Sequence, residues 1–138
     1  MNRAPALRLL TAAEHAADAN ASVLVLPNDA DPLEHHAAIA NAARIELHFP
    51  QFTDGRAYSQ AYLIRRRLRF AGDLRATGDV LADQLIQMER TGFSSAVLKE
   101  GVALDDAQRQ LDRFPAFYQG DVAHDAPYRK ALAADTAK

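Results

Sequence analysis

The chain has 138 residues, of which 49% are hydrophobic and 25% are charged, and its formal net charge is -2. This length suits one domain with a real core, and the small net charge gives no general attraction to nucleic acid or to anionic membranes. The absence of cysteine excludes a disulfide framework, a thiolate metal site and a cysteine nucleophile.

The N-terminal residues also carry information about the compartment. Charges interrupt the first 20 residues too early for a signal peptide, and no apolar run approaches the length of a membrane span. We therefore expect a cytoplasmic protein without a membrane or nucleic-acid partner.

The first predicted elements are a helix, a strand and a second helix. Apolar side chains recur at helical spacing over residues 7–19. The short apolar run at 22–26 ends at a proline, which favours a buried parallel strand. Residues 31–43 then predict a helix, because Asp31 can cap its first turn and Pro32 suits the first helical position.

The middle of the chain repeats this alternation. Residues 44–49 alternate between apolar and polar side chains, which is typical of a strand, and residues 55–70 predict a helix. The next strand covers residues 72–78. Asp79 can cap the helix that follows, and this helix ends at Gly92, as helices often do at glycine.

The C-terminal part contains one more strand and one more helix. The strand is predicted over residues 94–101 and the helix over residues 104–114, with Pro115 ending it. Beyond this point the pattern is lost. We predict a single α/β domain over residues 1–118 and a loosely ordered tail over residues 119–138.

Four consecutive strand–helix units after an N-terminal helix predict an α/β fold with parallel strands. Two architectures fit: half of a TIM barrel, or an open flavodoxin-like sheet. Polar strand residues favour the half barrel, because a sheet covered on both faces would prefer apolar residues there. These residues are Glu46, His48, Asp73 and Arg75. A half barrel exposes strand edges, so we expect it to form a homodimer or to bind another chain.

Both architectures place ligands beyond the C-terminal ends of the strands. The residues there that we predict to bind an anion or substrate are Arg56, Ser59, Arg75, Asp79 and Lys99. Arg56 and Ser59 fall in the first turn of a helix, where free backbone N–H groups and the helix dipole favour an anion. A structural interpretation stays open, in which Asp54 caps the helix and Arg56 lies in solvent.

For three further residues, the sequence leaves both a functional and a structural interpretation open. A charge in a central strand must be paired or lie near a cavity, so Arg75 either contacts a ligand or forms an ion pair with Glu46 or Asp73. His48 and Asp54 are weak candidates for proton transfer at the mouth of the sheet. A histidine near a strand end is also commonly a structural polar residue.

The sequence lacks the motifs of the common cofactor sites. The histidines are scattered without H-x-x-x-H spacing, so no metal site is predicted. Glycine-rich phosphate loops and the G-x-S-x-G elbow are missing too, so no cofactor is predicted and enzymatic activity is left open. The arginines at 65, 66, 67 and 69 do not share one helix face, and we expect a solvated surface there.

Residues 49–93 (FPQFTDGRAYSQAYLIRRRLRFAGDLRATGDVLADQLIQMERTGF) resemble the core signature of a bacterial domain-of-unknown-function family. The family pattern is F-P-x-F-x-D-G-R, then an aromatic, Ser, Ala and Leu/Ile-Arg, followed by G-[DE]-L-R-A, G-D-V, D-Q and R-x-G-F. The resemblance extends over about residues 22–118, including LPNDADPLEHH. The family usually has Gly-Phe-Asp before the fourth strand, where this chain has Ser94 in place of the acid.

Members of that family are usually encoded beside assimilatory sulfite reductase and are labelled as oxidoreductases of sulfite reduction. The resemblance therefore implies a place in sulfate assimilation. It implies an accessory protein that acts as a partner of sulfite reductase. The alternative is a small oxidoreductase of the same pathway that binds an oxyanion or a flavin phosphate through Arg56, Ser59 and Arg75.

Overall fold

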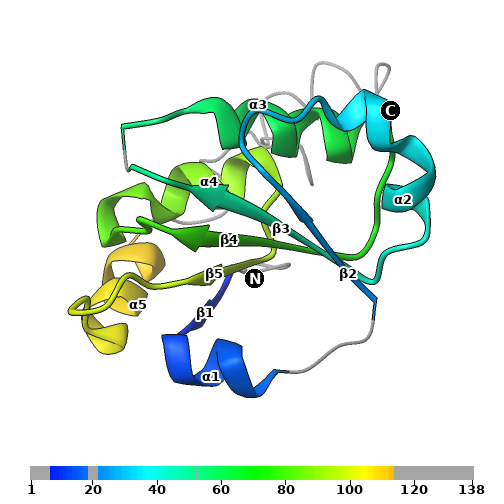
Figure 1. Ribbon diagram of the computed structural model, residues 1–138. Coiled ribbons are helices and arrows are strands. Elements are labelled where there is room, and N and C mark those ends of the chain that lie inside the picture. Colours follow the sequence, from blue (N-terminus) through cyan, green and yellow to red (C-terminus); the bar gives the residue numbers. More distant parts are fainter. Residues whose placement is uncertain (1–6, 19–21, 52, 114–138) are drawn as a thin grey trace, which may run out of the picture.

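The computed structural model describes residues 7–18, 22–51 and 53–113 of the chain. These residues form a parallel sheet with the strand order β1-β5-β4-β3-β2 and helices on both sides of it (Figure 1). The strands are β1 (Arg8–Leu10), β2 (Val23–Leu26), β3 (Arg44–Phe49), β4 (Asp73–Gly78) and β5 (Ser95–Val97). The predicted α/β fold with parallel strands is thereby confirmed.

The helices follow the strands in chain order. The α-helices are α1 (Ala12–Ala17), α2 (His36–Ala40), α3 (Arg56–Tyr62), α4 (Leu85–Thr91) and α5 (Leu104–Asp112). The shorter segments are the 3₁₀ turns η1 (Pro32–His35) and η3 (Ala82–Gln84) and the π-helical segment η2 (Leu63–Arg67). No helix in this part of the chain is long and apolar enough to cross a membrane.

The winding of the sheet combines features of the two predicted architectures. Strands β2 to β5 lie side by side in chain order, as they would in a segment of a barrel. Strand β1 lies beyond β5, so the connection from β1 to β2 runs across the sheet in the opposite direction. Because parallel crossovers are right-handed, this connection places α1 on the face opposite to α2, α3 and α4 (Figure 1).

The N-terminal helix was predicted too long. Residues 8–10 form strand β1, which pairs with β5, and the helix begins only after Thr11. Thr11 and Glu14 form a capping box, in which each side chain accepts a hydrogen bond from the other's backbone N–H. The four residues LRLL are too few for periodicity to separate a helix from a strand, so pairing with β5 decides. Residues 114–138, including the predicted loose tail, lie outside the described residues.

The core lies between the sheet and the helices α2, α3, α4 and α5. Alternate strand residues point into it, and the apolar strand residues with no exposed surface are Ile45, Leu47, Phe49, Leu74, Ala76 and Ala96. The ring of Phe49 packs edge-on against Tyr58, with centroids 5.1 Å apart, and lies 5.8 Å from the ring of Phe93. The opposite residues of β3 and β4 are polar and face α1, which is where the charged side chains gather.

Arg65 differs from the prediction of a solvated arginine surface. Its guanidinium donates hydrogen bonds to the backbone carbonyls of Gly92 (2.8 Å), Phe70 (2.9 Å) and Gly72 (2.8 Å). It also lies over the ring of Phe70, 5.5 Å from the centroid. Burial lowers the pKa of Arg65 from its usual value. The side chain therefore joins the end of η2 to the loop before β4 and to the end of α4.

Replacing Arg65 with methionine should lower the free energy of unfolding by about 2–4 kcal/mol, because three carbonyl oxygens lose a charged donor. Urea denaturation of the purified variant measures the loss. Arg66→Met is the matched control, because Arg66 is exposed and this change should cost less than about 0.5 kcal/mol. Equal stability of the two variants would contradict a structural role for Arg65.

Candidate functional site

Polar side chains gather at two places in the described residues. The first, here called the rim cluster, lies at and beyond the C-terminal ends of β3, β4 and β5 and comprises His48, Asp54, Arg56, Thr77, Asp79 and Lys99. The second, here called the sheet-face cluster, lies between the sheet and α1 and comprises Arg8, His15, Asp18, Arg44, Glu46, Asp73, Arg75 and Ser95. All but two of the residues predicted to form a site belong to the rim cluster.

Asp54 accepts several hydrogen bonds in the rim cluster. Its carboxylate accepts hydrogen bonds from the Arg56 guanidinium at 2.8 and 3.1 Å and from the Arg56 backbone N–H at 3.1 Å. The Asn28 side-chain amide donates a further bond of 2.7 Å. These contacts, led by the Arg56 side chain, lower the pKa of Asp54 to about 2. The carboxylate is therefore ionised at neutral pH, and it orients both the helix start and the arginine.

The second ion pair of the rim cluster joins Asp79 to Lys99. The Lys99 ammonium nitrogen lies 2.8 Å from the Asp79 carboxylate, and the Lys99 backbone N–H donates to the carbonyl of Val80 at 3.0 Å. The backbone N–H of Asp79 donates to the Phe49 carbonyl at 2.8 Å. A pair whose lysine is more than half exposed contributes little stability by itself. It does join the segment after β5 to the segment after β4.

The remaining predicted residues lie near these pairs. His48 is exposed on β3, and its Nδ1 lies 3.3 Å from the Thr77 hydroxyl of the neighbouring strand. Ser59 is exposed on α3. The structure thus brings Asp54 together with Arg56, and Asp79 together with Lys99. The roles of these residues in binding or proton transfer stay predictions.

Arg75 lies in a different place from the predicted rim. It is the third residue of β4, its side chain has no exposed surface, and it points toward α1. Its guanidinium donates to Ser95 at 2.9 Å and to Asp73 at 3.0 Å. Of the two proposed ion-pair partners, Asp73 is therefore present. Glu46 instead accepts a bond of 3.0 Å from Arg44.

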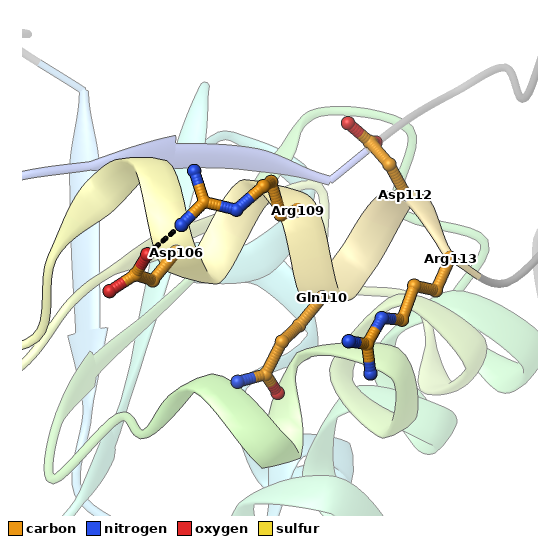
Figure 2. Close-up of a pocket in the computed structure, with 5 residues that line it drawn as sticks. All are labelled: Asp106, Arg109, Gln110, Asp112 and Arg113. Carbon is orange, nitrogen blue, oxygen red and sulfur yellow. Dashed lines mark hydrogen bonds and ion pairs between the residues drawn. The ribbon is translucent and has the colours of Figure 1, made fainter.

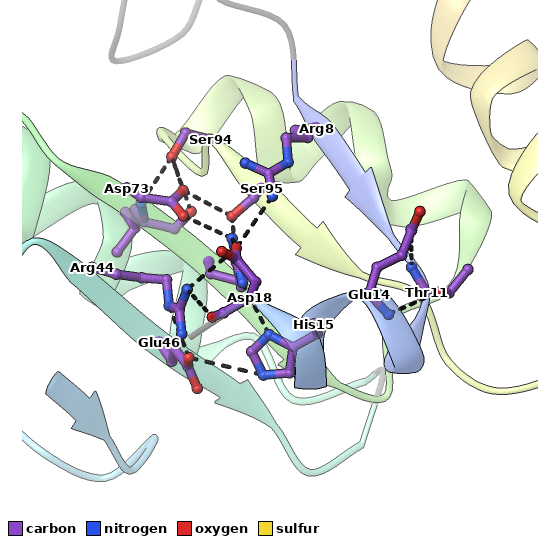
Figure 3. A network of polar contacts seen from close by, with 12 residues as sticks. Arg8, Thr11, Glu14, His15, Asp18, Arg44, Glu46, Asp73, Ser94 and Ser95 are labelled. Carbon is purple, nitrogen blue, oxygen red and sulfur yellow. Dashed lines mark hydrogen bonds and ion pairs between the residues drawn. The ribbon is translucent and has the colours of Figure 1, made fainter. Parts of the chain in front are cut away.

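The sheet-face cluster is centred on one carboxylate oxygen (Figure 3). The Oδ2 atom of Asp18 lies 2.7 Å from Arg75, 3.2 Å from Arg8 and 3.4 Å from Arg44. Hydrogen bonding by Arg75, together with the charges of all three arginines, lowers the pKa of Asp18 from its usual value against the opposing effect of burial. Three guanidinium groups from β1, β3 and β4 therefore converge on one anionic atom.

Other side chains hold these guanidinium groups in place. His15 Nδ1 lies 3.0 Å from Arg75, while its other ring nitrogen lies 3.9 Å from Glu46. Asp73 accepts hydrogen bonds from the hydroxyls of Ser94 at 2.7 Å and Ser95 at 2.8 Å. Ser94, which replaces the usual acid of the resembled family, thus contacts the aspartate that holds Arg75.

Sequence reasoning did not find most of this cluster. Arg8, His15, Asp18 and Arg44 received no role, because they lie on elements whose proximity no local pattern encodes. The signal that did exist was the polar alternation of β3 and β4, with Glu46 and Arg75 side by side in register.

Gln60 also received no role from the sequence. It is buried on α3, and its amide nitrogen donates to the carbonyls of Pro27 at 2.8 Å and Ala30 at 2.9 Å. These bonds fix the loop after β2, which also carries Asn28, a hydrogen-bond donor to Asp54. Gln60 therefore supports the rim cluster from inside the molecule.

A shallow pocket of about 550 Å³ lies beside α5 (Figure 2). It is lined by Asp106, Arg109, Gln110, Asp112 and Arg113. All five belong to α5 or directly follow it, and Arg109 forms an ion pair with Asp106 one turn earlier. Among the described residues, one helix end lines this pocket, so no converging groups from other described elements define a binding site there. Within the described ranges, no group of three or more potential metal ligands occurs.

Comparison with known proteins gives one result. Comparisons with curated proteins and with solved structures found no significant match to the chain. A family model described as a bacterial protein of unknown function (DUF934) matches residues 23–129. The match covers the strands from β2 to β5, the whole rim cluster, the sheet-face cluster except for Arg8, His15 and Asp18, and most of the chain. The chain belongs to this family of bacterial proteins.

Proposed function

We propose that this chain is an accessory protein of assimilatory sulfite reduction, which acts in the cytoplasm as a partner of sulfite reductase. The gene neighbourhood implied by the sequence resemblance supports the pathway. The exposed edge of the sheet at β2 supports a role in binding another chain, and this is the structural observation on which the proposal rests.

Strand β2 has the properties of a pairing edge. In the part of the chain that the structure describes, it pairs with β3 alone, so its other side carries backbone groups without a strand partner. Natural proteins commonly protect an edge strand with a charged residue or a proline. The sequence of β2, VLVL, contains neither. Val25 has 59% of its surface exposed in this strand. A partner that covers β2 would bury this apolar surface.

The rim cluster is less suited to catalysis on an oxyanion than the sequence suggested. Arg56 and Lys99, two cations predicted to bind the anion, each contact a carboxylate of this chain at 2.8 Å. An external anion at either position must compete with that carboxylate. The rim therefore favours polar docking over the tight binding of a small charged substrate.

The first test measures sulfite-dependent turnover by the sulfite reductase of the same organism, with its natural electron donor, in the presence and absence of this protein. We expect turnover to rise with added protein and to saturate at a fixed ratio of the two proteins. We also expect the two proteins to co-purify. Unchanged turnover, together with no association at high concentration, would contradict the accessory role.

Val25→Lys tests whether β2 is the contact. A lysine at this exposed position should weaken association with the reductase by about tenfold or more, because it places a charge on the apolar edge. The variant should keep its melting temperature. Gln87→Lys, an equal change in charge at an exposed position of α4, should leave association unchanged. If Val25→Lys instead abolishes a homodimer without affecting the reductase, β2 binds a second copy of this chain.

The second candidate is the small oxidoreductase that binds an oxyanion or a flavin phosphate. One observation favours its binding step, namely the convergence of three arginines on Asp18. That site lies on the sheet face and includes only Arg75 of the residues predicted to bind an anion.

A further inference from the structure

We propose that the arginines of the sheet-face cluster form a binding site for a small inorganic oxyanion, and that the Asp18 carboxylate occupies this site in its absence. The ligand class is a tetrahedral oxyanion such as sulfate or phosphate. This inference concerns binding alone and does not depend on the partnership with sulfite reductase.

The first argument is the convergence of donors. Arg8, Arg44 and Arg75 lie on three different strands, yet each directs a guanidinium nitrogen to the same oxygen of Asp18, at 3.2, 3.4 and 2.7 Å. A guanidinium carries five N–H donors in a fixed planar arrangement. An oxyanion with several acceptor oxygens and two charges can use more of these donors than one carboxylate oxygen does.

The second argument is that the donors stay in place without Asp18. Arg75 is held by Asp73 and Ser95, and Arg44 is held by Glu46, whose carboxylate lies 3.0 Å from its Nε. Both guanidinium groups are almost fully buried and belong to central strands. The site is therefore preorganised, and a ligand that replaces Asp18 needs little rearrangement of the sheet.

The third argument concerns charge. Without the Asp18 carboxylate, the three arginines outnumber the carboxylates of Glu46 and Asp73. The cluster then carries a net positive charge, with the 60% exposed side chain of Arg8 on its solvent side, and this favours uptake of an anion. The Ser95 hydroxyl is a further polar group at this place, and it lies 2.9 Å from Nε of the Arg75 guanidinium.

The fourth argument is accessibility. The Asp18 side chain is 35% exposed and that of Arg8 is 60% exposed, so one side of the cluster faces solvent. Asp18 follows α1, a short helix with no buried residue. Its attachment to the sheet therefore depends largely on the polar contacts of Asp18 and His15, which an external anion can exchange for its own.

The test is chemical rescue of Asp18→Asn, which removes the internal anion and keeps the shape of the side chain. We expect this variant to melt below the wild type in sodium chloride. Sodium sulfate at equal ionic strength should raise its melting temperature by about 5 °C or more, and that of the wild type by much less. Sulfate should bind the variant about tenfold more tightly than the wild type in calorimetry, because the competing carboxylate is gone.

Controls separate the proposed site from general effects of salt. Phosphate should act as sulfate does, whereas acetate, which is planar and carries a single charge, should give a smaller shift. Asp54→Asn provides the matched control, because Asp54 contacts one arginine rather than three, and its variant should show only the small shift with sulfate that the wild type shows. Adding Arg8→Gln to Asp18→Asn should remove most of the rescue.

The outcomes decide the proposal. If Asp18→Asn is unfolded in chloride, folding in sulfate supports the site and failure to fold in sulfate overturns it. The proposal is also overturned if Asp18→Asn has the same melting temperature in sulfate as in chloride. An independent measurement uses the wild type: excess sulfate should shift the side-chain Nε–H resonances of Arg44 and Arg75, and unchanged resonances would count against the site.

Discussion

Replacing Arg75 with methionine is expected to lower the free energy of unfolding by about 3 kcal/mol. Methionine keeps the apolar volume in β4 but removes the charge that faces Asp18 and Asp73. Breaking a buried ion pair by removing one partner typically costs about 3–5 kcal/mol, and the lower end applies because both carboxylates keep some contact with solvent. Guanidinium chloride denaturation followed by circular dichroism measures the change.

The matched control for this prediction is Arg56→Met. Arg56 forms an ion pair of similar length with Asp54, at 2.8 Å, but its side chain is exposed at the rim. An exposed ion pair contributes up to about 1 kcal/mol, so this variant should lose little stability. A similar, small loss in both variants would show that the sheet-face cluster does not stabilise the fold. Arg75→Lys should not restore stability, because an ammonium cannot reproduce the planar arrangement of donors.

The second large effect is expected at Gly78, the last residue of β4. Its φ angle is +95°, and a Cβ atom added there would lie 2.3 Å from the carbonyl oxygen of Phe49. That oxygen cannot move away easily, since it accepts the backbone N–H of Asp79 at 2.8 Å. Gly78→Ala should therefore cost about 3 kcal/mol or more, combining strain at positive φ with overpacking. Thermal and urea unfolding measure the loss.

Gly101→Ala separates the two causes. Gly101 has nearly the same φ angle, +94°, but an added Cβ would meet no atom within 4 Å. This variant should therefore show the backbone strain alone, about 1–2 kcal/mol. The difference between the two variants measures the close approach of β4 to the end of β3. If both variants lose the same stability, the contact with Phe49 does not constrain the rim.

The same contact has a consequence for His48. The Cβ of an alanine at position 78 would also lie 2.7 Å from the His48 ring, which must then turn away from Thr77. Any chemistry that depends on His48 should therefore be lost in Gly78→Ala beyond the loss explained by unfolding. Glycine at position 78 allows the C-terminal ends of β3 and β4 to lie close together.

Much of the fold could be predicted because its signals are local. The alternation of Arg44, Glu46 and His48 with apolar residues identified β3, and Asp31 with Pro32 marked the start of a helical segment. The same alternation showed that one face of the sheet carries charge. These patterns depend on neighbours within a few residues, so the sequence alone specifies them.

Other features needed contacts between distant parts of the chain. Residues 8–10 are compatible with a helix or a strand, and their pairing with β5 selects the strand. Arg65 belongs to a run of arginines that predicts a solvated surface, yet three carbonyls from two other segments surround it. Charge partners are chosen by distance in space, and periodicity holds no information about them.

The candidate sites show the same division between local sequence signals and contacts between distant segments. The sequence by itself determined a parallel α/β fold and a charged strand face that includes Arg75, and it placed Asp54 and Arg56 together at a polar rim while leaving their role open. Only the tertiary structure decided that Arg75 lies on the sheet face below α1 and shares Asp18 with Arg8 and Arg44. The reason is physical: the crossover from β1 to β2 carries α1 over the polar face, and the low polarity of that interior forces each buried charge to find a partner there.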